Sequence, residues 1–429
     1  GGILRSIVRI TVSPRWRLWR GEQEARRDTF FVFQLMERLK YSYNETSLFA
    51  SVDATLYQSI IAFDSSDPML VSWGHRNAAF SFTAIGLHPL AKICLQRVQR
   101  GSETGIPSLD MKALSEFTEG FRYYLRGEFR DSDRHFQESI SAAESCGDGF
   151  TLLQALHMNR HRAAWSGTAV EELSIAKRVF GVAQEIGNAR GICWGWYDQA
   201  AAFARLGMLQ EATTAIVQSK GQFTDEQWKL THSIFGTVHG YVHLQCSSYD
   251  KARKSLESAW TLVKQSRLMF EFNVHCLPHL LESVTGPRWV NRMPKEDRRF
   301  AKSLQVWIRL LYRAYPPLQP LMLRVLGRLF ASEGHTRKAV REFERSEAVA
   351  HQRDMPYQRA RALLDLAAVK EEGRGDNRAK AIELLKATES VIPQAEGWLL
   401  GNEVDQAVVA ASFDRDAWEA ENSEWSAAR

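Results

Sequence analysis

The stretch that decides the fold runs from Leu114 to Ala259 and is broken by short turn signals at a fixed spacing. The breaks read Gly127-Glu128-Phe129, Gly167-Thr168, Gly207-Met208-Leu209 and Ser247-Ser248-Tyr249, and their first residues stand 40 positions apart. A constant period of this size is typical of a protein built from stacked repeats. Each unit is predicted to be two amphipathic helices joined by a tight turn, because the apolar residues on both sides of each break recur with helical spacing.

Small and large residues recur at fixed distances from each turn. The small ones stand seven positions before and five after the first turn residue, and a larger one stands nine after it. Small residues let two helices approach closely, and the larger residue fills the gap between neighbouring hairpins. The triplets that follow this pattern are Gly120, Ser132 and Phe136; Ala200, Ala212 and Ile216; and Gly240, Ala252 and Leu256. The unit around Gly167 departs, with Arg160 and Glu172 at the small positions.

This arrangement resembles tetratricopeptide repeats, in a long version whose period is near 40 residues rather than about 34. The resemblance implies an all-α fold, a right-handed α-solenoid of about eight helical hairpins in which one core runs from end to end. The same pattern continues outside the central stretch, with further turns expected at Gly86, Gly286, Gly334 and Gly373.

These boundaries divide the chain into three regions. Residues 1–22 carry most of a local excess of arginine and are predicted to be a basic connector; a segment lying on a membrane surface is the alternative, because tryptophans alternate with the arginines. Residues 23–400 form the solenoid, with its first helices expected at about 22–41 and 47–63. Residues 401–429 have a net charge of −5 and are predicted to be a C-terminal cap or an acidic linker, after a helix over 398–411.

The composition indicates the class of protein and the compartment in which we expect it. Hydrophobic residues make up 45% of the 429 residues, enough for a folded core, and no apolar run approaches the roughly 18 residues of a membrane span. There is no secretory signal, and the five cysteines are scattered without a CxxC pair, which is typical of free thiols in a reducing cytosol. We therefore expect a cytoplasmic protein. The chain begins Gly-Gly without Met, which suits a fragment of a longer protein.

The sequence lacks the motifs of phosphate and acyl chemistry. It has no GxxxxGK[ST], GxSxG or HExxH pattern and no kinase set, so we expect a non-catalytic chain without a cofactor. The pairs His157/His161, His239/His243 and His275/His279 are each four residues apart, which places both rings on one helix face. No carboxylate or cysteine completes a metal site at a known spacing, except Cys276 beside His275, so histidines of the groove or the core are the favoured interpretation and no metal is expected.

In tetratricopeptide repeats the first helix of each hairpin lines the concave groove. Carried onto this sequence, the groove positions are Trp73, Arg76, Phe80, Phe117, Phe121, Tyr124, His157, His161, Trp165, Trp194, Tyr197, Arg205, Tyr241, Arg324 and Arg328. Aromatic and arginine side chains dominate protein interfaces, so this surface suits a protein or peptide segment, with its centre expected at Trp194, Tyr197 and the small residue Ala201. The alternative is that tight coiling buries these aromatic side chains in the core.

A broader resemblance covers nearly the whole chain. The run from Phe33 to Ala91, and Met355 to Leu366, are similar to the repeat half of large bacterial signalling ATPases. The resemblance implies a regulatory scaffold for protein–protein interaction, whose partner is either another protein or a linked ATPase, kinase or cyclase domain of the same chain. A nucleic-acid-binding solenoid that combines arginine with aromatic stacking is the alternative function.

Overall fold

The computed structural model describes residues 48–63, 67–103, 108–221, 229–266, 269–287, 289–291, 293–401 and 408–410. Within them the fold is an all-α solenoid, and the one β feature is an isolated parallel bridge between Ile392 and Val409. The predicted basic connector, the helix expected at 22–41 and the acidic end of the chain after residue 410 lie outside the described residues.

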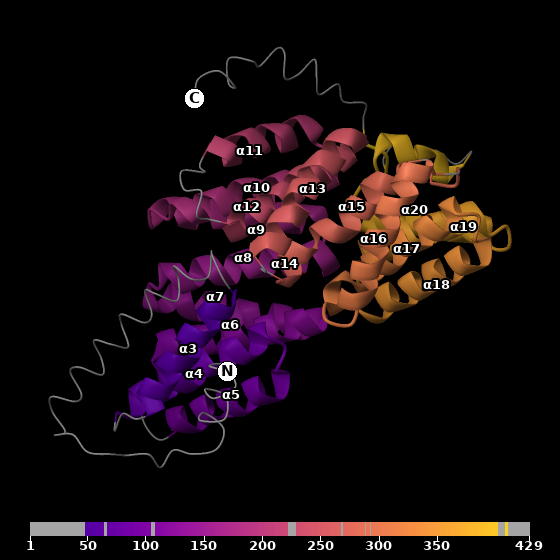
Figure 1. Ribbon diagram of the computed structural model, residues 1–429. Helices are drawn as coiled ribbons and strands as arrows, with labels where there is room; N and C mark the ends of the chain where they lie inside the picture. Colours follow the sequence, from indigo (N-terminus) through magenta and orange to yellow (C-terminus); the bar gives the residue numbers. More distant parts are fainter. Residues whose placement is uncertain are drawn as a thin grey trace.

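Helix α3 (Leu48–Phe63) precedes eight antiparallel hairpins in the described part of the chain (Figure 1). The hairpins are α4 (Pro68–Ala84) with α5 (His88–Glu103), α6 (Leu109–Arg126) with α7 (Phe129–Cys146), α8 (Gly149–Ser166) with α9 (Ala169–Glu185), α10 (Ala189–Leu206) with α11 (Leu209–Gly221), α12 (Lys229–Gln245) with α13 (Tyr249–Ser266), α14 (Glu271–Val274) and α15 (Cys276–Thr285) with α16 (Lys295–Leu311), α17 (Gln319–Ser332) with α18 (Thr336–Gln352), and α19 (Pro356–Val369) with α20 (Arg374–Ala387). Two 3₁₀ helices are also present, η1 (Pro316–Leu318) and η2 (Gln394–Leu400). The predicted number of hairpins is therefore confirmed.

Small and large residues meet within one hairpin, and not between neighbouring hairpins as the sequence pattern predicts, because each large residue packs against the first helix of its own hairpin. A Cβ placed on Gly120 would lie 2.7 Å from the ring of Phe136, so only glycine allows α6 and α7 to cross so closely. Gly240 faces Leu256 in the same way, at the same offsets from its own turn. Because the small and large positions were read from the period alone, these contacts confirm the repeat register.

The turns between the paired helices adopt two kinds of backbone conformation. Gly127 and Gly207 adopt left-handed conformations, with φ of +72° and +80°, which an L side chain rarely adopts. Ser247 has a positive φ without being glycine. Gly167 differs from the prediction, because its φ of −99° and ψ of −176° are extended and do not require glycine. The turn after α8 therefore reverses the chain without a left-handed residue.

Pro278 interrupts the first helix of the sixth hairpin at His275, because it has no N–H to donate to Val274 and its ring clashes with that carbonyl. One local expectation was wrong. Where the structure describes the helix expected over 398–411, at residues 398–401 and 408–410, no α-helix is present: η2 ends at Leu400, and Val409 pairs with Ile392.

Residues 388–401, called here the strap, leave α20 and run past the turns of four consecutive hairpins. Hydrogen bonds of 2.9–3.0 Å run from Ala169 to Thr388, from Val391 to Arg205, from Ala395 to Ser247 and from Trp398 to Pro287. Three or four strap residues separate the contacts with successive hairpins. The strap therefore links the last hairpin to the middle of the solenoid.

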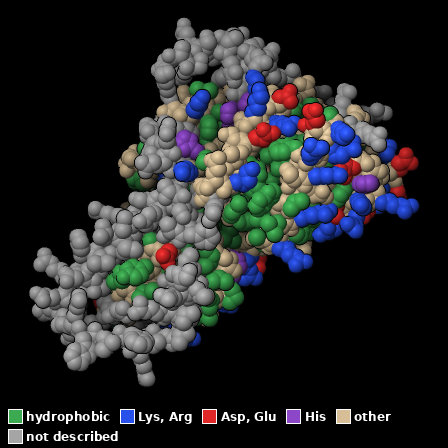
Figure 2. Space-filling model, viewed as in Figure 1, with side chains coloured by type: hydrophobic (Ala, Val, Ile, Leu, Met, Phe, Trp, Pro, Cys, Tyr) green, Lys and Arg blue, Asp and Glu red, His purple; other side chains and the backbone are tan. Residues whose placement is uncertain are grey.

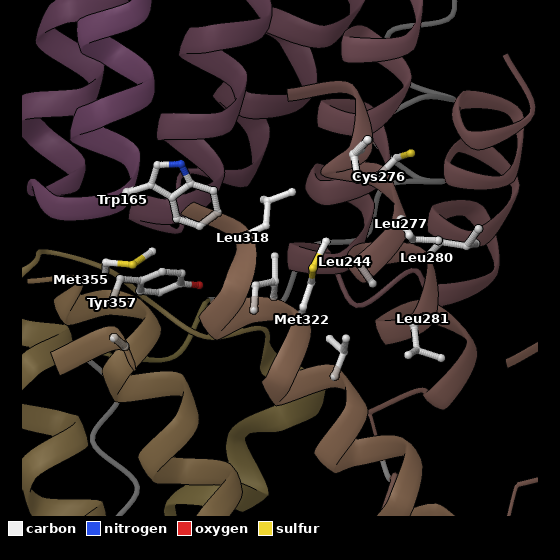
Figure 3. Packing of buried hydrophobic residues seen from close by; sticks show 14 of the residues in the cluster. Trp165, Leu244, Cys276, Leu277, Leu280, Leu281, Leu318, Met322, Met355 and Tyr357 are labelled. Carbon is white, nitrogen blue, oxygen red and sulfur yellow. The ribbon is translucent and has the colours of Figure 1, made fainter. Parts of the chain in front are cut away.

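Helices far apart in the sequence also meet. Helix α19 contacts α8, and η1 contacts α6, although more than a hundred residues separate each pair in sequence. Figure 3 shows the apolar side of this contact: Trp165 of α8, Leu318 of η1, Met322 of α17 and Tyr357 of α19 share one buried cluster. The concave side is therefore narrowed between α8 and α19.

No helix among the described residues is long and apolar enough to cross a membrane.

A turn glycine and a helical glycine that both face open space are expected to respond to alanine with opposite signs. Gly334 has φ +80° and Gly181 lies within α9, and an added Cβ would meet nothing within 4 Å at either position. Gly334→Ala should therefore destabilise the fold by about 1 kcal/mol through backbone strain alone. Gly181→Ala should stabilise it by roughly 0.5–1 kcal/mol. Urea denaturation of both variants measures this, and equal effects would contradict the backbone assignment.

Candidate functional site

The concave side contains a pocket, called here the charged pocket, in the region where α19 contacts α8. Its free volume is about 100 Å³, and α8, α10, α12, α15, α17, α19 and the strap all contribute side chains. The charged residues that line it are Arg160, Glu172, Arg205, Glu282, Arg324, Arg361 and Glu396. The pocket thus combines buried arginines with buried carboxylates.

A second pocket, called here the aromatic pocket, lies towards the first hairpins and has a free volume of about 110 Å³. Phe80 of α4 stacks on Phe117 and Phe121 of α6, with ring centroids 6.2 and 5.8 Å apart. On the other side, the His157 ring lies parallel to Trp194 at 4.4 Å. The lining is predominantly apolar and contains no arginine or carboxylate.

The two pockets adjoin one another. Ile234 and Phe272 line both of them. His157 faces the aromatic pocket and His161 the charged pocket, and their rings meet edge to face at 4.8 Å. The interior is therefore one groove with an aromatic end and a charged end.

The hairpin that departs from the repeat pattern supplies one ion-pair cluster. Arg160 and Glu172, the two residues at the small positions, pair with each other across α8 and α9 at 3.0 Å. Glu172 also binds Arg205, and Arg160 binds Asp198 at 3.2 Å. All four side chains are buried. Arg160 and Glu172 are therefore compatible with the repeat, because the salt bridge between them replaces the contact between two small residues.

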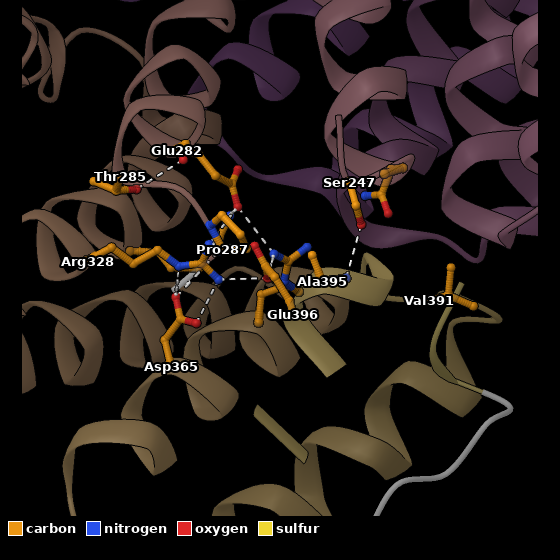
Figure 4. Close-up of polar contacts among 12 residues, drawn as sticks. Ser247, Glu282, Thr285, Pro287, Arg328, Asp365, Val391, Ala395 and Glu396 are labelled. Atoms are coloured by element: carbon orange, nitrogen blue, oxygen red, sulfur yellow. Dashed lines mark hydrogen bonds and ion pairs between the residues drawn. The ribbon is translucent and has the colours of Figure 1, made fainter. Parts of the chain in front are cut away.

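A second cluster joins three hairpins to the strap (Figure 4). Arg328 of α17 binds Asp365 of α19 at 2.6 Å and Glu396 of η2 at 2.8 Å. Arg361 of α19 also binds Glu396, at 2.6 Å, and Glu282 of α15, at 3.2 Å. Arg324 completes the group with a 2.6 Å bond to Glu282. Three arginines therefore face three carboxylates, all of them buried.

Burial and charge act against each other on the pKa values of these groups. Burial alone would raise the pKa of the Glu396 carboxyl, but Arg328 and Arg361 hold it at about 2. Burial lowers the pKa of His161 and His275 well below the usual value, and neighbouring histidines and Arg160 lower it further. The clusters are therefore ionised and the two histidines neutral at pH 7.

The structure brings a carboxylate to one histidine pair, which the sequence search missed. Asp198 lies beside His157 and His161, with the possible ligand atoms of all three within 4.8 Å of one another. However, Arg160 already contacts Asp198 and the Nδ1 of His161, and Asp198 binds His157 at 2.8 Å. A fixed guanidinium at this place repels a cation. The geometry therefore favours a hydrogen-bonded cluster over a metal site.

The comparisons with known proteins support the fold. No protein-family model matches the sequence, and no curated sequence matches it either. A solved structure, that of a Rap protein complexed with competence and sporulation factor, aligns with 84% of this chain and 98% of its own at a TM-score of 0.62 and 10% identity. The chain is a tetratricopeptide-like helical-repeat protein. At this identity the likeness concerns the fold alone.

The predicted groove residues of this repeat protein separate into three groups. His161, Trp165, Arg205, Tyr241 and Arg324 line the charged pocket. Phe80, Phe117, Phe121, His157 and Trp194 line the aromatic pocket. Trp73, Arg76, Tyr124, Tyr197 and Arg328 line neither.

The third group corrects the prediction. Tyr124, Tyr197 and Arg328 are fully buried, so they support the groove from behind and cannot contact a ligand directly. Trp73 and Arg76 stack on each other on α4, at 4.7 Å, away from both pockets. The pocket expected around Trp194, Tyr197 and Ala201 is divided, because Ala201 lines the charged pocket and Trp194 the aromatic one.

Sequence reasoning missed Glu282, Asp365, Arg361 and Glu396, yet a signal exists for Glu282 and Asp365. Asp365 binds Arg324 at a separation of 41 residues, and Glu282 binds it at 42. These separations are one repeat period, which places residues side by side on neighbouring first helices. A search for opposite charges one period apart would have found these two carboxylates. It would not have found Arg361, whose carboxylate partners lie 79 and 35 residues away, or Glu396, which lies outside the repeats.

The outer surface has one further feature. Figure 2 shows hydrophobic side chains gathered over the region of α15 and α16, with lysine and arginine around them. Val306 and Leu310 of α16 are each 66% exposed. Nothing in the described residues covers this strip, and it does not communicate with either pocket.

Loss of the strap carboxylate is expected to destabilise the protein strongly. Glu396→Ala leaves Arg328 and Arg361 buried with incomplete compensation, so it should cost about 3–5 kcal/mol. Glu344→Ala is the matched control, because Glu344 pairs with Lys370 at 2.9 Å but the two side chains are 47% and 35% exposed. That pair should contribute at most about 1 kcal/mol. Urea denaturation of the two variants tests the difference, and a similar small loss in both would refute the role of the cluster.

Glu271→Gln is expected to stabilise the fold at pH 8. Burial raises the pKa of Glu271 from 4.5 to about 7, although its hydrogen bond from Tyr124 and the charge of Arg160 lower it. Above pH 7 the carboxylate is charged in both states, and the folded state carries the cost of burying it. Glutamine removes that charge and can still accept the bond from Tyr124.

The free energy of unfolding of the Glu271→Gln variant should exceed that of the unchanged protein by about 1–3 kcal/mol at pH 8. The difference should be smaller at pH 5, where the carboxyl of Glu271 in the folded protein is already protonated. Denaturant midpoints at the two pH values measure it. A gain that does not depend on pH would show that the buried charge is not its cause.

Proposed function

We propose that this chain is a non-catalytic scaffold for protein–protein interaction, which binds a peptide segment of its partner in the groove formed by the two pockets. The proposal rests on one observation: the two pockets adjoin each other at Ile234 and Phe272. Together they make one concave site that is lined by predicted groove residues. Concave, largely apolar sites with a few polar groups are typical of ligand binding.

The size of the site favours an extended segment over a folded domain. An apolar cavity of about 150 Å³ accommodates one benzene molecule. The two pockets, at about 100 and 110 Å³, therefore match single side chains that project from a peptide. The solved Rap protein of similar fold was complexed with competence and sporulation factor, which adds support.

The charges of the groove argue against phosphate chemistry and nucleic acid. Arg205, Arg324 and Arg328 are buried within the concave side and do not form an exposed row of cations. Binding of an extended phosphate backbone requires several accessible cations along one surface. The scaffold function is therefore preferred to the nucleic-acid-binding alternative.

Within this proposal, the chain acts in bacterial cytoplasmic signal transduction. Its partner segment comes either from another protein or from a linked ATPase, kinase or cyclase domain. The chain itself supplies recognition and not a reaction, and it uses no metal or cofactor.

Filling either pocket should abolish peptide binding. Ala84 lies at the end of α4 and lines the aromatic pocket, and Ala164 of α8 lines the charged pocket. Peptides selected by the full chain from a random phage-displayed library serve as ligands, with affinity measured by fluorescence anisotropy. Ala84→Phe and Ala164→Phe should each weaken binding by at least about tenfold, or 1.4 kcal/mol.

Ala379→Phe is the control, since Ala379 lies on the exposed side of α20 and lines neither pocket. Circular dichroism confirms that each variant remains helical. A library that yields no binder, or binders unaffected by both groove variants, would reject the proposed site.

A further inference from the structure

We propose that the ligand of this groove is bipolar: a carboxylate binds in the charged pocket and an apolar side chain in the aromatic pocket. The inference rests on the proposed peptide-binding function and adds the chemistry and the orientation of the ligand. The inference is based on which hydrogen-bonding groups of the two pockets already have partners within the protein.

The carboxylates of the charged pocket have no spare oxygen. One carboxylate oxygen of Glu172 contacts the guanidinium of Arg160, and the other contacts that of Arg205. Both oxygens of Glu282 and both of Glu396 receive hydrogen bonds from neighbouring arginine, histidine or tyrosine side chains. A cationic ligand group would therefore have to break existing ion pairs before it could bind here.

The arginines of the same pocket do have spare donors. The Nε–H groups of Arg160, Arg324 and Arg361 are buried and have no hydrogen-bond partner among the described residues. All three side chains line the charged pocket, as does His161, whose Nε2 is also without a partner. A buried donor without an acceptor costs free energy, so an incoming acceptor would recover it.

A carboxylate suits these donors better than a neutral acceptor. Hydrogen bonds from guanidinium to carboxylate are assisted by charge and are about twice as strong as neutral ones. Gln245 Oε1 is a further buried polar atom of this pocket without a partner among the described residues, and the amide of the same side chain donates to Tyr357. The acid could be an Asp or Glu side chain or the free C-terminus of a peptide.

The aromatic pocket offers no comparable donors. Its described lining has neither arginine nor lysine, and the stacked rings of Phe80, Phe117 and Phe121 present apolar faces. A carboxylate placed there would lose hydration without gaining a partner. The ligand is therefore oriented, with its acidic group near α17 and α19 and its apolar group near α4 and α6.

Designed peptides test this assignment on the full chain. Each peptide carries Phe near one end, Glu near the other and a Gly-Ser spacer of varied length, with both termini blocked. Matched peptides replace Glu by Gln, or replace it by Gly and leave the C-terminus free, which separates a side-chain carboxylate from a terminal one. Calorimetry should show that a carboxylate of either kind raises affinity by at least about tenfold over Gln.

Two matched protein variants locate the effect. Gln245→Glu adds a carboxylate to the charged pocket, whereas Gln154→Glu adds one to the aromatic pocket. Gln245→Glu should satisfy the spare donors from within and remove the preference for Glu over Gln peptides. Gln154→Glu should weaken all Phe-bearing peptides while the ratio between Glu and Gln peptides stays.

The outcomes distinguish the inference from the function on which it rests. If Glu and Gln peptides bind alike, or if Gln245→Glu leaves their ratio unchanged, the carboxylate assignment is wrong while the groove stands. The same holds if the random library yields binders without acidic groups and no designed peptide binds. If the library yields no binders at all, the peptide-binding function itself is rejected.

Discussion

The buried cluster of three arginines and three carboxylates is the constraint on which the arrangement of this solenoid depends. Glu282, Arg328, Asp365 and Glu396 come from α15, α17, α19 and η2, so one polar network ties three consecutive hairpins to the strap. Such a network is costly unless every charge has its partner. Here the carboxylate oxygens are all engaged, so displacing one of these elements would leave several buried charges without compensation.

This network changes what kind of repeat protein the chain is. In an ordinary solenoid each repeat contacts only its neighbours, and the concave side stays open. In this chain α19 contacts α8, and the strap passes the turns of four hairpins. Long-range contacts of this kind make stability depend on hairpins far apart in the sequence and reduce the groove to two small pockets. Beyond the strap, Val409 pairs with Ile392 in an isolated bridge.

Features that obey the repeat period could be predicted from the sequence, whereas those that interrupt the period could not. Gly120 against Phe136 was predictable, since both residues lie within one hairpin at fixed offsets from its turn. Arg160 and Glu172 were taken as weak points of the pattern, yet they pair because the same two offsets place them opposite each other. Glu396 was not predictable, because its partners lie 35 to 147 residues away and no repeat position marks it. The groove residues were found as a set, but the sequence could not tell which of them, such as Tyr197, the packing of the helices would bury.

The contact between α8 and α19 also affects the charged pocket. This pocket is lined by Trp165 of α8, by Tyr357 of α19 and by Glu396 of the strap. Under the function proposed above, a ligand in this pocket would contact all three elements at the same time. By linkage, a ligand that binds better when these elements are together stabilises their contact by its difference in affinity. The buried arginines that hold the strap therefore also line the proposed binding site, so recognition there and the arrangement of α8, α19 and the strap depend on the same contacts.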